Sequence, residues 1–158
     1  EKQLPAQFPD CDENDLISRY ALASEEFTHI ARITADCWCI HPDIIRQCVN
    51  LVKESCHYGS NTIFRTFQEG QDVQVFTKQA LTWLDKNTPL NREHPWSHFD
   101  LNDDERQEFK EAVGDITQLI NRENEATVKT SIDTNEDLEF AIRNYEKWKT
   151  GQKKSKTN

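Results

Sequence analysis

The sequence predicts an all-α fold, a single-domain disulfide-tied helical bundle of five to six amphipathic helices. Three observations support this prediction. Apolar residues recur at helical spacing along most of the chain. Only 4 glycines and 5 prolines occur in 158 residues, which suits long helices better than the tight turns of a sandwich or barrel. Most of the 5 cysteines lie close together, where they could tie neighbouring helices.

We expect one helical domain over residues 1–150 and a flexible, basic tail over residues 151–158. The first predicted helix runs from Leu16 to about Thr34, and acidic residues before it suit the positive end of the helix dipole. Its apolar face contains Leu16, Ile17, Tyr20, Ala23, Phe27, Ile30 and Ala31. The second helix begins at Pro42, because proline is tolerated in the first turn, and ends at Gly59.

Four further segments complete the predicted order. A short helix is expected over residues 61–70, and another begins at Asp72 and continues through Leu84. Residues 87–99 contain two prolines and two histidines without periodicity, so they are expected to form a loop. A fifth helix is predicted over residues 103–122. The last begins at Thr134, where Asp137 completes a capping box.

The cysteines predict two disulfides. On one helix Cys48 and Cys56 would lie roughly 12 Å apart, too far to bond to each other. Antiparallel packing of the first two helices would instead pair Cys11 with Cys56, and Cys48 with Cys39 or Cys37, Cys39 being preferred. One cysteine then remains, either buried or available to link a dimer. Disulfides persist in oxidising compartments, so we expect a secreted protein.

Metal binding is the alternative interpretation of the same region. A zinc site could draw on sulfur and imidazole ligands among Cys37, Cys39, His41, Cys48, Cys56 and His57, but their spacing matches no familiar zinc pattern. A calcium loop could use Asp100, Asn102, Asp104 and Glu111, but Glu105 stands where the sharp turn needs glycine. We therefore expect neither a metal nor a cofactor.

Motifs typical of catalysis are missing from the sequence, so no enzymatic activity is expected. The net charge of −9 disfavours nucleic acid, and no apolar run is long enough to span a bilayer. The resulting hypothesis is a secreted, non-enzymatic helical protein that binds another protein as a ligand, effector or antagonist. The binding surface would be an exposed helix face or the 87–99 loop, with His94, Trp96 and His98 as candidate interaction residues.

Two alternatives remain open. The bundle could carry a small apolar ligand in a core lined by Phe27, Phe64, Phe67, Phe76 and Trp83. The chain could also be an intracellular helical adaptor or a fragment of a larger protein. Free thiols would favour the second alternative.

Overall fold

The computed structural model describes residues 10–53, 55–88, 92–93 and 103–155. Its centre is a four-stranded mixed sheet, so the predicted all-α class is wrong. The strands are β1 (His29–Arg32), β2 (Cys56–Ser60), β3 (Gln74–Thr77) and β4 (Asp115–Gln118), in the order β1-β3-β2-β4. The helices within the described residues are α1 (Leu16–Ala23), α2 (Pro42–Leu51), α3 (Lys78–Asn87), α5 (Asp103–Ala112) and α6 (Asn135–Ser155).

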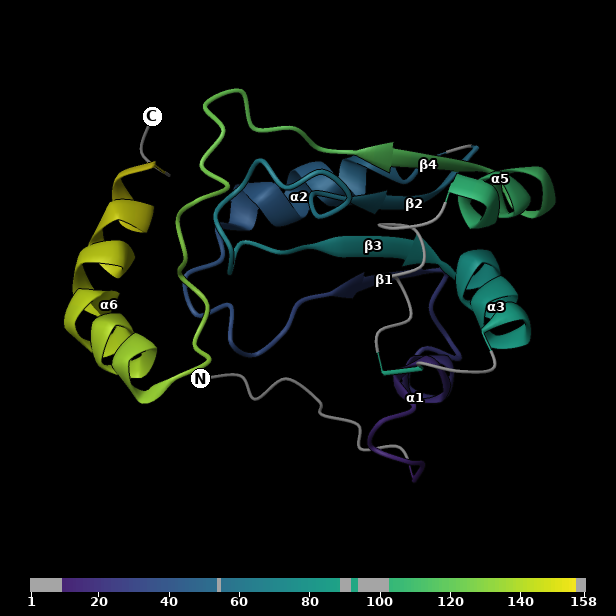
Figure 1. Ribbon diagram of the computed structural model, residues 1–158, viewed down its shortest axis with the longest axis horizontal. Coiled ribbons are helices and arrows are strands. Elements are labelled where there is room, and N and C mark those ends of the chain that lie inside the picture. The colour runs from purple at the N-terminus through teal and green to yellow at the C-terminus, as the bar shows by residue number, and fades with distance from the viewer. Residues whose placement is uncertain (1–9, 54, 89–91, 94–102, 156–158) are drawn as a thin grey trace.

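The strands do not all run in the same direction. β3 pairs antiparallel with both β1 and β2, whereas β2 and β4 are parallel. The chain therefore leaves β1, β2 and β4 at one edge of the sheet and leaves β3 at the opposite edge. Figure 1 shows this arrangement: β2 and β4 point toward the side where α6 stands, and β3 leads directly into α3.

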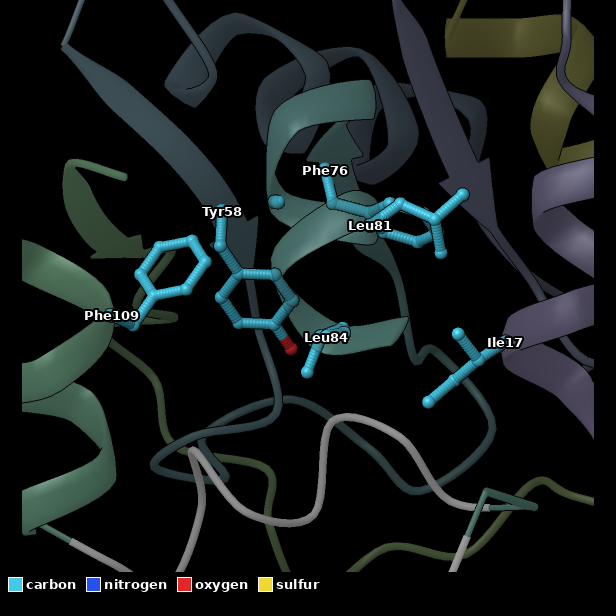
Figure 2. Close-up of a cluster of buried hydrophobic side chains, with 7 residues drawn as sticks. Ile17, Tyr58, Phe76, Leu81, Leu84 and Phe109 are labelled. Atoms are coloured by element: carbon cyan, nitrogen blue, oxygen red, sulfur yellow. The ribbon is translucent and has the colours of Figure 1, made fainter. Parts of the chain in front are cut away.

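Helices cover both faces of the sheet. On one face, α1, α3 and α5 pack over the strands and form a core of Ile17, Tyr58, Phe76, Ala80, Leu81, Leu84 and Phe109 (Figure 2). On the other face, α2 forms a second core of Ile44, Cys48, Val52, Val73 and Val75. Burial of each large apolar side chain stabilises the fold by about 1.5–3 kcal/mol. Since Val73 to Phe76 are all buried, β3 lies between two layers of helices.

The first predicted helix combines a helix and a strand. α1 ends at Ala23, and the backbone N–H and hydroxyl of Ser24 both donate to the carbonyl of Tyr20. The side-chain bond competes with continuation of the helix. Ile30, expected on the helical face, instead lies in β1 opposite Phe76. The regular spacing of apolar residues across the break concealed it.

The second predicted helix also begins as expected, at Pro42, but ends early. α2 stops at Leu51, and Gly59 lies inside β2 rather than at a helix terminus. A Cβ atom on Gly59 would lie 3.0 Å from the Leu51 Cβ atom, so glycine allows α2 to approach the strand closely. The segment over residues 61–70 contains no helix. The cap of α3 is Thr77, whose hydroxyl accepts from the Ala80 N–H, and not Asp72.

The last two predicted helices have different outcomes. The fifth is shorter than expected, because α5 ends at Ala112 and Gly114 follows with a φ of 145° before β4. The capping box of α6 is confirmed: the Asp137 N–H donates to the Thr134 hydroxyl, and the Thr134 N–H donates to the Asp137 carboxylate. α6 continues to Ser155, beyond the start of the expected tail. The flexibility of residues 151–158 and the 1–150 boundary stay predictions.

None of the five cysteines is in a disulfide. The expected bridges Cys11–Cys56 and Cys48–Cys39, or Cys48–Cys37, are therefore absent, and so is the basis for a covalent dimer. The geometric reasoning failed because Cys56 begins a strand and does not continue the helix of Cys48. Secretion was inferred mainly from the expected disulfides. Without them, localisation outside the cell stays a prediction. None of the helices described is long and apolar enough to cross a membrane.

Candidate active site at the carboxyl edge of the sheet

Three loops meet at the edge where β1, β2 and β4 end. They are residues 33–41 after β1, residues 61–73 after β2 and residues 119–134 after β4. Open α/β sheets bind ligands in the crevice outside the carboxyl ends of their strands, because the connecting loops converge there. This edge is the place where the topology favours a functional site (Figure 1).

One face of the sheet changes from apolar to polar as it approaches this edge. Across the strands, one row contains apolar or aromatic side chains that belong to or pack on the first core: Ile30, Phe76, Tyr58 and Ile116. The next row on the same face is polar throughout and contains Arg32, Gln74, Ser60 and Gln118. Burial of polar groups is unfavourable without hydrogen-bond partners, so this row would destabilise the fold unless its side chains were paired.

Hydrogen bonds connect most of the polar row. Arg32 Nη1 donates to Gln74 Oε1 at 2.8 Å, and Gln74 Nε2 donates to Thr62 Oγ1 at 3.5 Å. The hydroxyls of Thr62 and Ser60 are 2.7 Å apart. Gln118 uses its side chain differently and binds the backbone of Phe64 in the 61–73 loop. The network fixes the side-chain amide of Gln74, which is 7% exposed.

The 33–41 loop is held against the 61–73 loop. Gln71 Nε2 donates to the Cys39 carbonyl at 3.2 Å, and Gln71 Oε1 accepts from the His41 N–H at 3.0 Å. Burial raises the pKa of the Cys37 thiol, although hydrogen bonds from Thr34 and the Asp72 backbone oppose this effect and the charges of Asp36 and Asp72 add to it. A thiol with a raised pKa is a poor nucleophile. Cys37 is therefore a buried packing residue and not a candidate nucleophile.

The 119–134 segment packs on both of these loops. The Ile132 N–H donates to the Asp36 carbonyl at 3.2 Å, which places Asp133 beside the 33–41 loop. The Thr130 N–H donates to the Glu69 carbonyl at 2.7 Å. Gly70 has a φ of 98°, and a Cβ atom there would lie 2.5 Å from the Ser131 nitrogen. The close approach of the two backbones thus requires glycine.

Charged groups of both signs surround this junction. Arg65 and Asp72 form a bidentate pair, with N–O distances of 2.8 and 3.0 Å. Lys129 Nζ lies 2.7 Å from Asp133 and 2.8 Å from Asp137. These contacts with Lys129 lower the pKa values of both aspartates, so both are ionised at neutral pH. Within the residues described, no group of three or more His, Cys, Asp or Glu side chains could hold a metal by itself.

Trp38 links the 33–41 loop to α6. Its ring meets the Trp148 ring edge-to-face, with centroids 6.1 Å apart. Its indole N–H is buried without a hydrogen-bond partner. α6 therefore contacts the 33–41 loop through this aromatic pair. Figure 1 shows α6 beyond the carboxyl edge of the sheet, with the segment after β4 between the helix and the strands.

Two clefts lie beside α5. One, of about 440 Å³, runs between α5 and the β4 side and is lined by Phe64, Arg106, Lys110 and Gln118, among others. The other, of about 540 Å³, lies between α3 and α5 and is lined by Lys78, Trp83 and Lys86, among others. Neither cleft includes Arg32, Asp36 or Asp133 in its lining. The two clefts and the loops at the carboxyl edge are thus different parts of the molecule, although charged side chains occur in both.

The residues singled out from the sequence have different outcomes, and the predicted interaction residues stay a prediction. His94, Trp96 and His98 lie outside the described residues. The expected apolar lining is dispersed: Phe27 and Phe64 are exposed, while Phe76 is buried in the core. Asp104 and Glu111 of the calcium template lie on α5, and Asp100 and Asn102 are outside the described residues. Phe64 and Trp83 line two separate clefts, so the expected side chains do not share one cavity there.

Sequence reasoning missed Arg32, Asp36, Asp72 and Asp133. Each stands at or just beyond the end of a short apolar stretch, or just before the next element begins. A charged residue at the end of a short apolar stretch indicates a site only when the stretch is recognised as a strand. The reason is that the loops after parallel strands meet at one edge of a sheet.

Comparison with known proteins gives one informative match. No protein-family model matches the chain, and no curated protein matches its sequence. The structure is similar to that of a cytidylyltransferase from Leptospira borgpetersenii serovar Hardjo-bovis, strain JB197, with a TM-score of 0.71 and 29% sequence identity. The match covers 81% of this chain and 53% of that chain, so this chain spans about half the length of its structural neighbour. This similarity overturns the expectations of an all-α binding protein and of a non-enzyme.

Proposed function

We propose that this chain forms part or all of a nucleotidyltransferase that moves a cytidylyl group from CTP to an acceptor. The structural similarity to a cytidylyltransferase is the observation that carries the proposal. The position of the charged loops supports it, since they lie at the edge of the sheet where nucleotides bind in folds of this kind.

The reaction needs no covalent intermediate on the protein. An oxygen of the acceptor attacks the α-phosphorus of CTP, the bond from that phosphorus to the β-phosphate oxygen breaks, and pyrophosphate leaves. If the attacking oxygen is a hydroxyl, its proton is released. Transfer of phosphoryl-type groups depends on positioning and on stabilising negative charge, so aspartate, lysine and arginine are sufficient. The raised pKa of Cys37 is consistent with a site that uses no thiolate.

In this proposal, Asp36 and Asp133 are the residues that would hold a magnesium ion. Mg²⁺ in nucleotide sites is usually held by one or two carboxylates together with substrate phosphates, and it keeps several waters. The Ile132–Asp36 backbone hydrogen bond brings the two aspartates onto adjoining segments. Lys129 and the Ser131 hydroxyl both donate to Asp133 and keep it ionised. When bound, the ion would polarise the α-phosphate and offset the charge of the leaving pyrophosphate.

Calorimetric titration of the protein with CTP in magnesium buffer tests the proposal. We expect saturable binding that requires Mg²⁺ and is tighter for CTP than for ATP. Asp36→Asn should weaken binding by at least about tenfold, which corresponds to about 1.4 kcal/mol. Asp103→Asn, on the exposed surface of α5, is the matched control and should bind CTP as the wild type does. Absence of CTP binding, or equal affinity in the Asp36→Asn variant, would contradict the proposal.

A further inference from the structure

Arg32 is an unusual arginine in this protein. Five of the other seven arginines pair with a carboxylate: Arg46, Arg65, Arg92, Arg106 and Arg143. Of the remaining two, Arg122 is exposed and Arg19 donates to the Glu13 carbonyl. What distinguishes Arg32 from both is a buried nitrogen that lacks a partner. Arg32 is half-buried, and its single hydrogen bond goes to the neutral side chain of Gln74. Its Nε atom is buried without a hydrogen-bond partner. Among the described residues it has no carboxylate within ion-pair distance.

A charge in this position costs free energy unless something compensates it. Proteins seldom bury a guanidinium without a counter-charge, because desolvation of the ion is unfavourable. Gln74 cannot compensate, since it carries no charge, and its own amide is held by Thr62. Arg32 is also the last residue of β1. It therefore lies at the edge of the sheet from which the loops with the charged residues begin. A negatively charged ligand at this edge would supply the missing counter-charge and a partner for the buried Nε atom.

We propose that Arg32, positioned by Gln74, Thr62 and Ser60, is a binding subsite for an oxyanion, either a carboxylate or a phosphate. A guanidinium presents a fork of donors that matches two oxygens of such a group. The inference rests on the proposed function and extends it: it assigns an anionic group to one of the two substrates. That group belongs either to the acceptor or to the triphosphate of CTP.

Side-chain NMR and thermal unfolding test the subsite without an activity assay. The Nε–Hε signal of Arg32, assigned by its loss in Arg32→Lys, should move as inorganic phosphate is added at constant ionic strength. Phosphate should also raise the melting temperature of the wild type, because ligands that bind only the folded state stabilise it. In Arg32→Gln the affinity for phosphate should fall by about tenfold or more, as expected for loss of a charge-assisted pair.

Arg32→Gln should melt at the same temperature as the wild type, or higher, in buffer without phosphate. This result separates a binding role from a structural one, since removal of an uncompensated charge relieves a cost instead of breaking a contact. Arg46→Gln on α2 is the matched control and should leave the phosphate response intact. An Arg32 signal that ignores phosphate, or a phosphate response that survives in Arg32→Gln, would overturn the subsite.

Titration with CTP identifies the source of the oxyanion. If CTP moves the Arg32 signal and Arg32→Gln weakens CTP binding, the oxyanion is part of the nucleotide. If phosphate still moves the signal when CTP is bound, the oxyanion is part of the acceptor. The outcome also separates the two proposals. CTP binding with an inert Arg32 contradicts the subsite alone, and a phosphate response without CTP binding contradicts the nucleotidyltransferase alone.

Discussion

Arg92 holds the first and third helices together, and its removal should destabilise the fold measurably. Its Nε donates to Asp15 at 2.8 Å, and its Nη2 donates to Asp85 at 2.6 Å and to Ser18 at 3.1 Å. Its Nη1 donates to the carbonyls of Thr88 and Asp85, at 3.1 and 3.3 Å. The guanidinium thus joins the N-terminus of α1 to the C-terminus of α3 through five hydrogen bonds.

The size of the effect follows from the burial of each partner. The side chain of Arg92 is 19% exposed and that of Asp15 is 26% exposed, so this pair is only weakly screened. Asp85 is 51% exposed, so solvent screening reduces the contribution of the Arg92–Asp85 pair to stability. Hydrogen bonds that involve a charge contribute about 1.5–3 kcal/mol when protected from solvent. We expect Arg92→Ala to lower the free energy of unfolding by about 2–3 kcal/mol.

Urea unfolding followed by tryptophan fluorescence measures this change. Arg92→Lys keeps the charge but loses the fork of donors, so it should recover about half of the loss. Arg46→Ala, whose partner Asp43 is exposed on α2, should cost less than about 0.5 kcal/mol. The reasoning would be refuted if Arg92→Ala and Arg46→Ala were equally stable, or if the lysine variant matched the wild type.

Three further predictions concern other parts of the molecule. Cys48 is buried, and burial raises its pKa to about 12, so the native protein should resist alkylation at this thiol near pH 8 while the urea-unfolded chain reacts. Gly70→Ala forces a left-handed conformation and a clash with Ser131, so it should cost more than about 1 kcal/mol and weaken CTP binding. Burial raises the pKa of Asp15, but hydrogen bonds from Ser18 and Arg92 outweigh it, so the folded pKa lies below 3.8. This stabilisation is complete above about pH 4 and is lost as the pH falls through the folded pKa, so Asp15→Asn should flatten acid unfolding curves below that pH.

The helix signals in the sequence were informative where capping chemistry was local. Pro42 begins α2, and Thr134 with Asp137 begins α6, because these interactions involve residues only one turn apart. The ends of the helices were predicted poorly. Ser24 and Gly114 terminate helical runs through a side-chain hydrogen bond and a left-handed backbone, and the apolar spacing continues past both.

The strands could not be recognised from alternation. In β3 every position except Thr77 is buried, including both polar Gln74 and apolar Val75. Its sequence therefore lacks the alternation of apolar and polar residues that is typical of a half-exposed strand. β2 contains a single large apolar residue, Tyr58. Each strand is four or five residues long, so its apolar residues fitted a helical template that included the helix beside it. The sheet depends on pairing between distant segments, which a local pattern does not record.

The candidate site was lost for the same reason. Arg32, Asp36 and Asp133 are separated in sequence and lie on segments at one edge because β1, β2 and β4 end there. The cysteines attracted attention because they are rare and clustered, yet Cys37 and Cys48 serve as buried side chains. A correct assignment of the strands would have brought the charged residues together at that edge from the sequence alone.

A crystal structure of the protein with CTP and magnesium tests the central claim most directly. We predict that the triphosphate lies between the 33–41 loop and residues 129–133, with the metal held by Asp36 and Asp133. A nucleotide bound instead in the cleft lined by Arg106 and Lys110, or no nucleotide at a saturating concentration, would contradict the assignment of the carboxyl edge as the active site.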